Sequence, residues 1–112
     1  MNWKPLSNAA DVDALKEASF AQPQLIFKHS TRCSISSMAK SRLERATPAG
    51  NVVFHYLDLI AHRNISSLVA DTFNVEHESP QILLIKKGEC VYDDSHSGIS
   101  MDDIAEQSEK HN

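Results

Sequence analysis

The chain has 112 residues, of which 41% are hydrophobic and 23% charged, so we expect a single globular domain over residues 1–112 and not a disordered or fibrous chain. Its formal net charge of −4 comes without a clustered basic excess, which argues against a nucleic-acid partner. No apolar stretch approaches the ~18 residues of a membrane span and the N-terminus lacks a signal-peptide pattern, so we expect no membrane partner and a cytoplasmic location.

The first predicted helix begins after Ser7 or Asn8, since either side chain can act as an N-cap, and it ends near Ser19. Its apolar residues recur at helical spacing and would form one buried face, made of Val12, Leu15 and Ala18. A proline at position 23 then stops the helix, and the apolar run over residues 25–27 predicts a buried central strand.

A second helical pattern starts just after Cys33 and ends before Pro48. Its predicted buried face comprises Ile35, Met38, Ala39, Leu43 and Ala46. Residues 52–57 have the β-branched and aromatic content of a strand, and residues 64–73 return to a helical pattern. The buried face of that third helix would comprise Ile65, Leu68, Val69 and Phe73.

The last third of the chain predicts an antiparallel hairpin and a final helix. Residues 82–85 form an apolar run, and the Lys87-Gly88 pair is typical of a tight turn into residues 90–92. Ser100 and Asp103 have the spacing of a helix cap, so the final helix is expected to run to about Ser108. This order of elements indicates an α/β, thioredoxin-like fold, a mixed central sheet of about four strands flanked by helices.

Cys33 lies where the first predicted central strand gives way to a helix. There the unpaired N–H groups of the first helical turn and the positive end of the helix dipole favour a thiolate over a thiol. We expect the amides of Ile35 and Ser36, together with the Ser36 hydroxyl, to stabilise the sulfur, while Arg32 adds positive charge beside it. A thiolate attacks disulfides, so Cys33 is predicted to be the catalytic residue of thiol–disulfide exchange.

The chain offers Cys33 no obvious partner cysteine. The residue three positions further on is Ser36, so an internal Cys-x-x-Cys disulfide cannot form. Cys90 is predicted at the distant end of the hairpin, whereas bridged cysteines need Cα atoms within ~7 Å, so we expect it to be a passive strand residue. The alternative for Cys33 is a small buried hydrophobic side chain, which is a frequent role of free cysteine.

Further residues are predicted at the same end of the sheet. Ser95 and His96 should return on the antiparallel strand to the level of Pro80. A histidine there could move protons or polarise a leaving thiol, or it could be an ordinary solvated loop residue. The residues expected to contact the substrate are Thr31, Ser79, Pro80, Ser95 and His96.

Two other groups of polar residues permit weaker hypotheses. Asp93, Asp94 and His96 suggest a metal site, but without a second well-spaced ligand pair a charged loop is the commoner explanation and no metal is expected. Basic residues also flank or follow the cysteine: Lys28, Arg32, Lys40, Arg42 and Arg45. Some could attract a carboxylate-bearing small thiol, whereas most would only solvate the helix face.

Three segments carry a resemblance to a known family: residues 28–36 around Cys33, Asp58-Leu59-Ile60, and residues 75–81 with the run His-Glu-Ser-Pro-Gln. They resemble the bacillithiol-system YtxJ family, the monothiol bacilliredoxins. The resemblance implies a thioredoxin fold, a cis proline at Pro80, and removal of bacillithiol from S-thiolated proteins by Cys33. It also matches Ser95-His96 to a Ser-His pair that an aromatic residue often follows in relatives, a residue missing here.

The sequence therefore predicts a monothiol thiol–disulfide oxidoreductase whose partners are S-thiolated proteins and a low-molecular-weight thiol, the latter a co-substrate and not a bound cofactor. One alternative is a glutathione-dependent monothiol glutaredoxin, including the iron–sulfur carrier type, although its Cys-Gly-Phe-Ser site does not match Ser34-Ile35. Another is a redox-inert thioredoxin-like module that presents the Pro80 edge to a protein partner.

Overall fold

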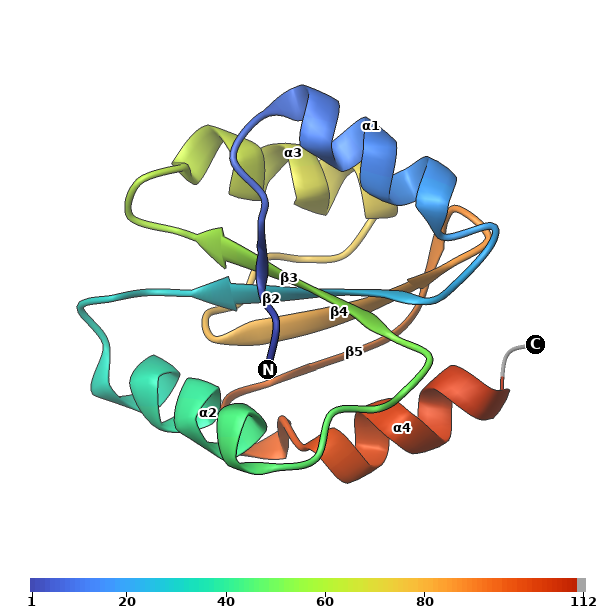
Figure 1. Cartoon of the computed structure of the whole chain (residues 1–112). Helices are drawn as coiled ribbons and strands as arrows, with labels where there is room; N and C mark the ends of the chain where they lie inside the picture. Colours follow the sequence, from blue (N-terminus) through green and yellow to red (C-terminus); the bar gives the residue numbers. More distant parts are fainter. Residues whose placement is uncertain (111–112) are drawn as a thin grey trace.

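The computed structural model describes residues 1–110 and shows a five-stranded sheet flanked by four α-helices (Figure 1). In chain order the elements are β1 (Lys4–Pro5), α1 (Ala9–Ala18), β2 (Gln24–His29), α2 (Ser34–Arg45), β3 (Val53–Asp58), α3 (Arg63–Phe73), β4 (Gln81–Lys86), β5 (Glu89–Ser95), the short 3₁₀ helix η1 (His96–Gly98) and α4 (Met101–Lys110).

The strands lie in the order β1-β3-β2-β4-β5. β1, β3 and β2 are parallel, whereas β4 runs antiparallel to β2 and β5 antiparallel to β4. Helices α1 and α3 cover one face of the sheet and α2 and α4 the other (Figure 1). The predicted α/β architecture is confirmed, and the additional strand is β1, which at two residues is too short to show a pattern in the sequence.

Each face of the sheet has its own hydrophobic core, because alternate residues of a strand point to opposite sides. On β2, Phe27 belongs to the core beneath α2 and α4, where it meets Leu43. Its neighbour Ile26 belongs to the opposite core, with Val12 of α1 and Val69 of α3. All six residues of β2 are buried, so this strand is the buried centre of the sheet, and the loop that carries Cys33 follows its last residue.

The predicted caps and turn are found in the structure. Asn8 is the N-cap of α1, and its side chain accepts a hydrogen bond from the Asp11 N–H. The Ser100 hydroxyl accepts from the Asp103 N–H at 3.2 Å, and α4 continues two residues beyond the expected end. Gly88 has φ +80° between β4 and β5, a left-handed conformation that tight hairpin turns require.

The predicted faces of the first two helices need correction. Ile35 and Met38 are 53% and 62% exposed, whereas Ser36 is fully buried beside Ala39. α2 is therefore rotated relative to the prediction: Ser36, whose hydroxyl is hydrogen-bonded, faces the core, and Ile35 faces solvent. Ala18 is likewise exposed at the end of α1. Within the described residues, no helix combines the length and apolar character needed to cross a membrane.

Candidate active site

Cys33 is the N-cap residue of α2, with extended backbone angles of φ −111° and ψ 121°. Its N–H donates to the Ser30 carbonyl at 3.1 Å, and its own carbonyl accepts from the Ser37 N–H at 3.0 Å. The thiol is free and partly exposed to solvent. The predicted position at a strand-to-helix turn is confirmed, and the alternative of a fully buried hydrophobic cysteine does not hold.

The first turn of α2 has no acidic residue to offset the positive end of the helix dipole. Ile35 and Ser36 occupy the second and third helical positions, where backbone N–H groups have no partner inside a helix. The Cys33 side chain accepts no capping hydrogen bond in this structure. The predicted donors thus lie in the turn that follows the cysteine, without a direct bond to its sulfur.

Ser36 has a different position from the one expected. Its fully buried hydroxyl lies 2.6 Å from His29 Nδ1 and accepts from the Ser30 N–H at 3.0 Å. The structure does not support the expected hydrogen bond from this hydroxyl to the Cys33 sulfur, because the hydroxyl is bonded to His29 and to the Ser30 N–H instead. Ser36 is therefore a positioning residue for the loop that carries Cys33.

His29 is the last residue of β2 and lies directly before that loop. The ring is buried between aromatic neighbours, with its centroid 5.7 Å from that of Phe27 and 5.6 Å from that of Tyr56. Burial, and secondarily the charge of Lys40, lower the pKa of His29 below its usual value of 6.5. In the neutral ring, Nδ1 can accept a hydrogen bond from the Ser36 hydroxyl.

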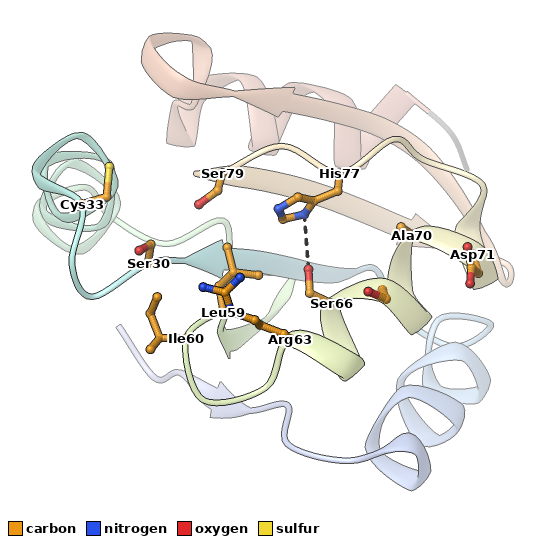
Figure 2. Close-up of a pocket in the computed structure, with 11 residues that line it drawn as sticks. Ser30, Cys33, Leu59, Ile60, Arg63, Ser66, Ala70, Asp71, His77 and Ser79 are labelled. Atoms are coloured by element: carbon orange, nitrogen blue, oxygen red, sulfur yellow. Dashed lines mark hydrogen bonds between the residues drawn. The ribbon is translucent and has the colours of Figure 1, made fainter.

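Cys33 opens onto a cavity of about 610 Å³ that lies between its own loop, helix α3 with the loop before it, and the segment before Pro80 (Figure 2). Cys33 stands at one end of the cavity and Asp71 at the other (Figure 2). The lining combines apolar surface, to which Leu59, Ile60 and Ala70 contribute, with polar side chains from Ser30, Arg63, Ser66, Ser67, His77 and Ser79. The site therefore combines a partly exposed thiol with a groove of mixed polarity that is large enough for a small molecule.

The Ser79–Pro80 peptide bond is cis, as the family resemblance implied. The Pro80 carbonyl accepts from the His96 N–H at 3.1 Å, and Ser95 pairs with Gln81 at the start of β4. The predicted return of residues 95 and 96 to the level of Pro80 is confirmed. The His96 side chain is exposed and is not among those that line the cavity.

The remaining predicted site residues differ in how they lie relative to the cavity. Ser79 lines the cavity together with Cys33. Thr31 and Arg32 are exposed on the loop before α2 and do not line the cavity. They are placed to contact a molecule that approaches Cys33 from solvent, not one inside the cavity. Pro80 is buried beneath the same region.

A buried cluster next to the cavity was not anticipated from the sequence. Lys28 of β2 is completely buried, and its Nζ lies 3.3 Å from His77 Nδ1. The Ser66 hydroxyl lies 3.3 Å from the same nitrogen (Figure 2). Burial lowers the pKa of Lys28 from 10.5 to about 8. The signal in the sequence is a lysine directly after an apolar run, and the sequence alone places it with the basic residues that flank the cysteine.

Cys90 is a half-buried residue of β5, paired with Ile85 at the end of β4 remote from Pro80. Burial, and to a smaller extent the nearby Asp93 carboxylate, raise the pKa of Cys90 from 9.0 to about 11. The thiol therefore stays protonated at neutral pH. Its position and its protonation both agree with the predicted passive role.

The charged loop that suggested a metal has internal hydrogen bonds. The Asp94 carboxylate accepts from the Tyr92 hydroxyl at 3.0 Å and from the Ser95 N–H at 2.8 Å. Among residues 1–110 no group of three or more histidine, cysteine or acidic side chains is arranged to hold a metal ion.

Comparison with known proteins adds a family match and a fold match. The family model described as monothiol bacilliredoxin BrxC matches residues 4–104. A solved structure described as an oxidoreductase with a thioredoxin fold is 28% identical, with a TM-score of 0.77 over 92% of this chain and 90% of that one. Thioredoxins from Malassezia sympodialis and Fasciola hepatica are 17% and 19% identical, with TM-scores of 0.74 and 0.72. The matches cover 98% and 97% of this chain and 90% and 99% of theirs, and they show the fold alone.

Proposed function

Because the chain belongs to the monothiol bacilliredoxin family, we propose that it removes a low-molecular-weight thiol, bacillithiol or a close relative, from S-thiolated proteins. The supporting observation is the position of Cys33, a partly exposed N-cap cysteine at the mouth of a cavity lined by both polar and apolar side chains. The third residue after it is a buried serine, which leaves the attacking cysteine without a neighbouring thiol. Such a site captures one half of a mixed disulfide and cannot resolve it internally.

In the proposed reaction the Cys33 thiolate attacks the small-thiol sulfur of the protein mixed disulfide. The Cys33–small-thiol disulfide forms as the original S–S bond breaks, and the protein sulfur leaves as a thiolate that takes up a proton from water. A second small thiol, after releasing its proton to water, attacks the small-thiol sulfur of the adduct, so that the bond to Cys33 breaks, the Cys33 thiolate is regenerated and a symmetrical small-molecule disulfide leaves. Electrons balance at each step because each exchange makes one S–S bond and breaks one.

The regenerating step requires a supply of reduced thiol, which is a property of the cytoplasm. We therefore propose a cytoplasmic location for the reaction. The cavity beside Cys33, with Ser79 in its lining, would hold the non-sulfur part of the small thiol, while the exposed Thr31 and Arg32 would face the protein from which it is taken.

Intact-mass spectrometry tests the proposal directly. A model protein carrying bacillithiol on a single cysteine is incubated with the wild type, with Cys33→Ser and with Cys90→Ser. We expect the model protein to lose its adduct while the wild type and Cys90→Ser each gain one small thiol, and Cys33→Ser to gain none. An adduct that persists in Cys33→Ser would sink the proposal.

The same assay decides between the two alternatives. A glutathione-dependent glutaredoxin would take glutathione from a glutathionylated model protein faster than it takes bacillithiol. A redox-inert module would gain no adduct from either substrate. We expect capture from both, with bacillithiol faster, since the family to which the chain belongs is the bacilliredoxins.

A further inference from the structure

Lys28 is a cation in an unusual environment. Its side chain is completely buried between β3 and β4, where Leu57 and Gln81 are its neighbours in register. Within residues 1–110 it forms no ion pair with a carboxylate, and its recorded side-chain partner is Nδ1 of His77. Burying an ammonium group without a counter-ion is costly, so a role beyond packing is indicated.

The hydrogen bonds around His77 determine which ring nitrogen carries the proton. A charged ammonium group has only donors, so Nδ1 must accept the bond from Lys28 Nζ at 3.3 Å. The Ser66 hydroxyl, also at 3.3 Å, can donate to the same atom. Nδ1 therefore carries no proton, and the neutral ring has its single N–H at Nε2.

The charge of Lys28 also keeps the ring neutral. Burial and the Lys28 ammonium lower the pKa of His77, with Glu78 acting weakly in the opposite direction. The ring projects from the segment before Pro80 toward the middle of the cavity (Figure 2). His77 thus offers a fixed N–H donor to whatever occupies the groove beside Cys33.

Other donors without partners lie along the same groove. The Ser79 hydroxyl, between Cys33 and His77 in Figure 2, is buried and has no hydrogen-bond partner. Arg63, on the opposite wall, is exposed and forms no ion pair within the described part of the chain. Asp71 contributes the one carboxylate of the lining, at the end remote from Cys33. The middle of the groove therefore suits an anionic group rich in acceptors.

We propose that His77 is a specificity-determining residue, whose Nε2–H binds a carboxylate of the small thiol captured by Cys33, and that Lys28 is the positioning residue that fixes the ring. The inference rests on the proposed function, because it assigns a binding role within the same site. Ser79 and Arg63 supply further donors to the same carboxylate-bearing part of the ligand.

The test compares two small thiols with the same peptide, one with free carboxylates and one with both carboxylates esterified. Glutathione and glutathione diethyl ester are each supplied as the mixed disulfide with 2-thiopyridine, from which Cys33 captures the peptide thiol and releases pyridine-2-thione. All proteins carry Cys90→Ser, and ionic strength is constant. The measured quantity is the ratio of the two second-order rate constants, acid over ester, with intact mass confirming the adduct.

We expect His77→Leu to lower this ratio about tenfold, the effect of one hydrogen bond to a charged group. His77→Gln should recover much of it, since its amide N–H₂ can occupy the place of Nε2–H. Lys28→Met should also lower the ratio, by less, because the donor remains but its orientation is lost. A purely structural role would slow both substrates equally and leave the ratio unchanged.

The outcomes separate this inference from the proposed function. If neither disulfide modifies Cys33, the proposed function fails. If both disulfides modify Cys33 but the ratio in a folded His77→Leu stays within about twofold of the wild type, only the role of His77 is overturned. A change of about twofold is less than one hydrogen bond to a charged group contributes. Long-range ¹H–¹⁵N spectra of the wild type give a readout without substitution: we expect the Nε2–H tautomer, and a proton on Nδ1 would overturn the assignment.

Discussion

The Ser36 hydroxyl lies 2.6 Å from Nδ1 of His29, directly beneath the turn that presents Cys33. The same oxygen accepts the Ser30 N–H, and Ser30 in turn accepts the Cys33 N–H through its carbonyl. A continuous chain of hydrogen bonds therefore connects the end of β2 to Cys33. The position of Cys33 depends on a side chain whose hydrogen bonds go to His29 and Ser30.

Ser36→Ala should destabilise the protein by about 1–3 kcal/mol, because the Ser30 N–H loses its acceptor in a partly buried position. We also expect slower capture of a small thiol by Cys33 and faster hydrogen exchange of the Ser30 amide. Urea unfolding, the adduct assay and exchange measurements check these effects. Ser37→Ala, at an exposed neighbouring position of α2, is the matched control and should behave as the wild type.

Cys90→Ser should leave the rate of adduct formation unchanged. In Cys33→Ser, the remaining Cys90 should react with iodoacetamide slowly at neutral pH, because burial and Asp93 raise the pKa of this thiol to about 11. The alkylation rate should increase as the pH approaches that value. Recovery of an intramolecular disulfide between the two cysteines after mild oxidation would contradict the passive role.

Much of the fold was predictable, because most elements carry a local signal. The apolar run of β2, the cap of α4 and the hairpin turn at Gly88 are all visible in the sequence. The orientation of α2 was not, since Ile35 at its start is exposed while Ser36 faces inward to meet His29. The spacing of apolar residues predicts which hydrophobic side chains are buried. It cannot predict that a serine is buried because its hydroxyl forms hydrogen bonds inside the protein.

The candidate site was predictable in part for a similar reason. Cys33 and Ser79 were identified because each lies next to a recognisable boundary between elements. The contact of Lys28 with His77 joins residues 49 positions apart, and no local pattern predicts it. Lysine in a strand normally extends to solvent, so its burial emerges only once β3 and β4 enclose β2.

Stability should fall in mild acid because of His55, which is buried on β3 and lies 2.7 Å from the Gln24 side-chain oxygen through Nε2. Burial first, and then Lys4, lower the pKa of His55 from 6.5 to about 4. The unfolded chain binds the proton more tightly, so the contribution is complete above pH 6.5 and is lost as the pH falls toward 4. We expect a loss of roughly 2 kcal/mol, after allowance for screening by solvent.

Urea unfolding at a series of pH values checks this window. His55→Gln removes the titrating group while keeping a donor for Gln24, so its stability should change less between neutral pH and pH 4. His96→Asn alters an exposed histidine at a positive-φ position that asparagine tolerates, and it should retain the wild-type slope. Equal slopes for His55→Gln and the wild type would show that other groups carry the acid sensitivity.

Lys28→Met should stabilise the fold at neutral pH, because the wild type buries a charge that methionine of similar length does not carry. Burial lowers the pKa of Lys28 from 10.5 to about 8, so the folded state binds this proton less tightly than the unfolded chain does. The cost is therefore complete below pH 8 and is relieved as the pH rises toward 10.5. We expect the variant to gain roughly 2 kcal/mol at neutral pH, less than the full pKa difference gives, because solvent near His77 screens the ammonium.

The free energy of unfolding of both proteins, measured in urea from neutral pH to pH 10, tests this expectation. The advantage of Lys28→Met should shrink across the upper part of that range, and an advantage that stays constant would show that Lys28 is not the titrating group. If Lys28→Met is more stable than the wild type but discriminates less between carboxylate and ester thiols, the buried ammonium opposes folding and contributes to selective binding of the carboxylate. If Lys28→Met were instead less stable throughout, packing and the hydrogen bond to His77 would be the reason that β2 carries a lysine at this position.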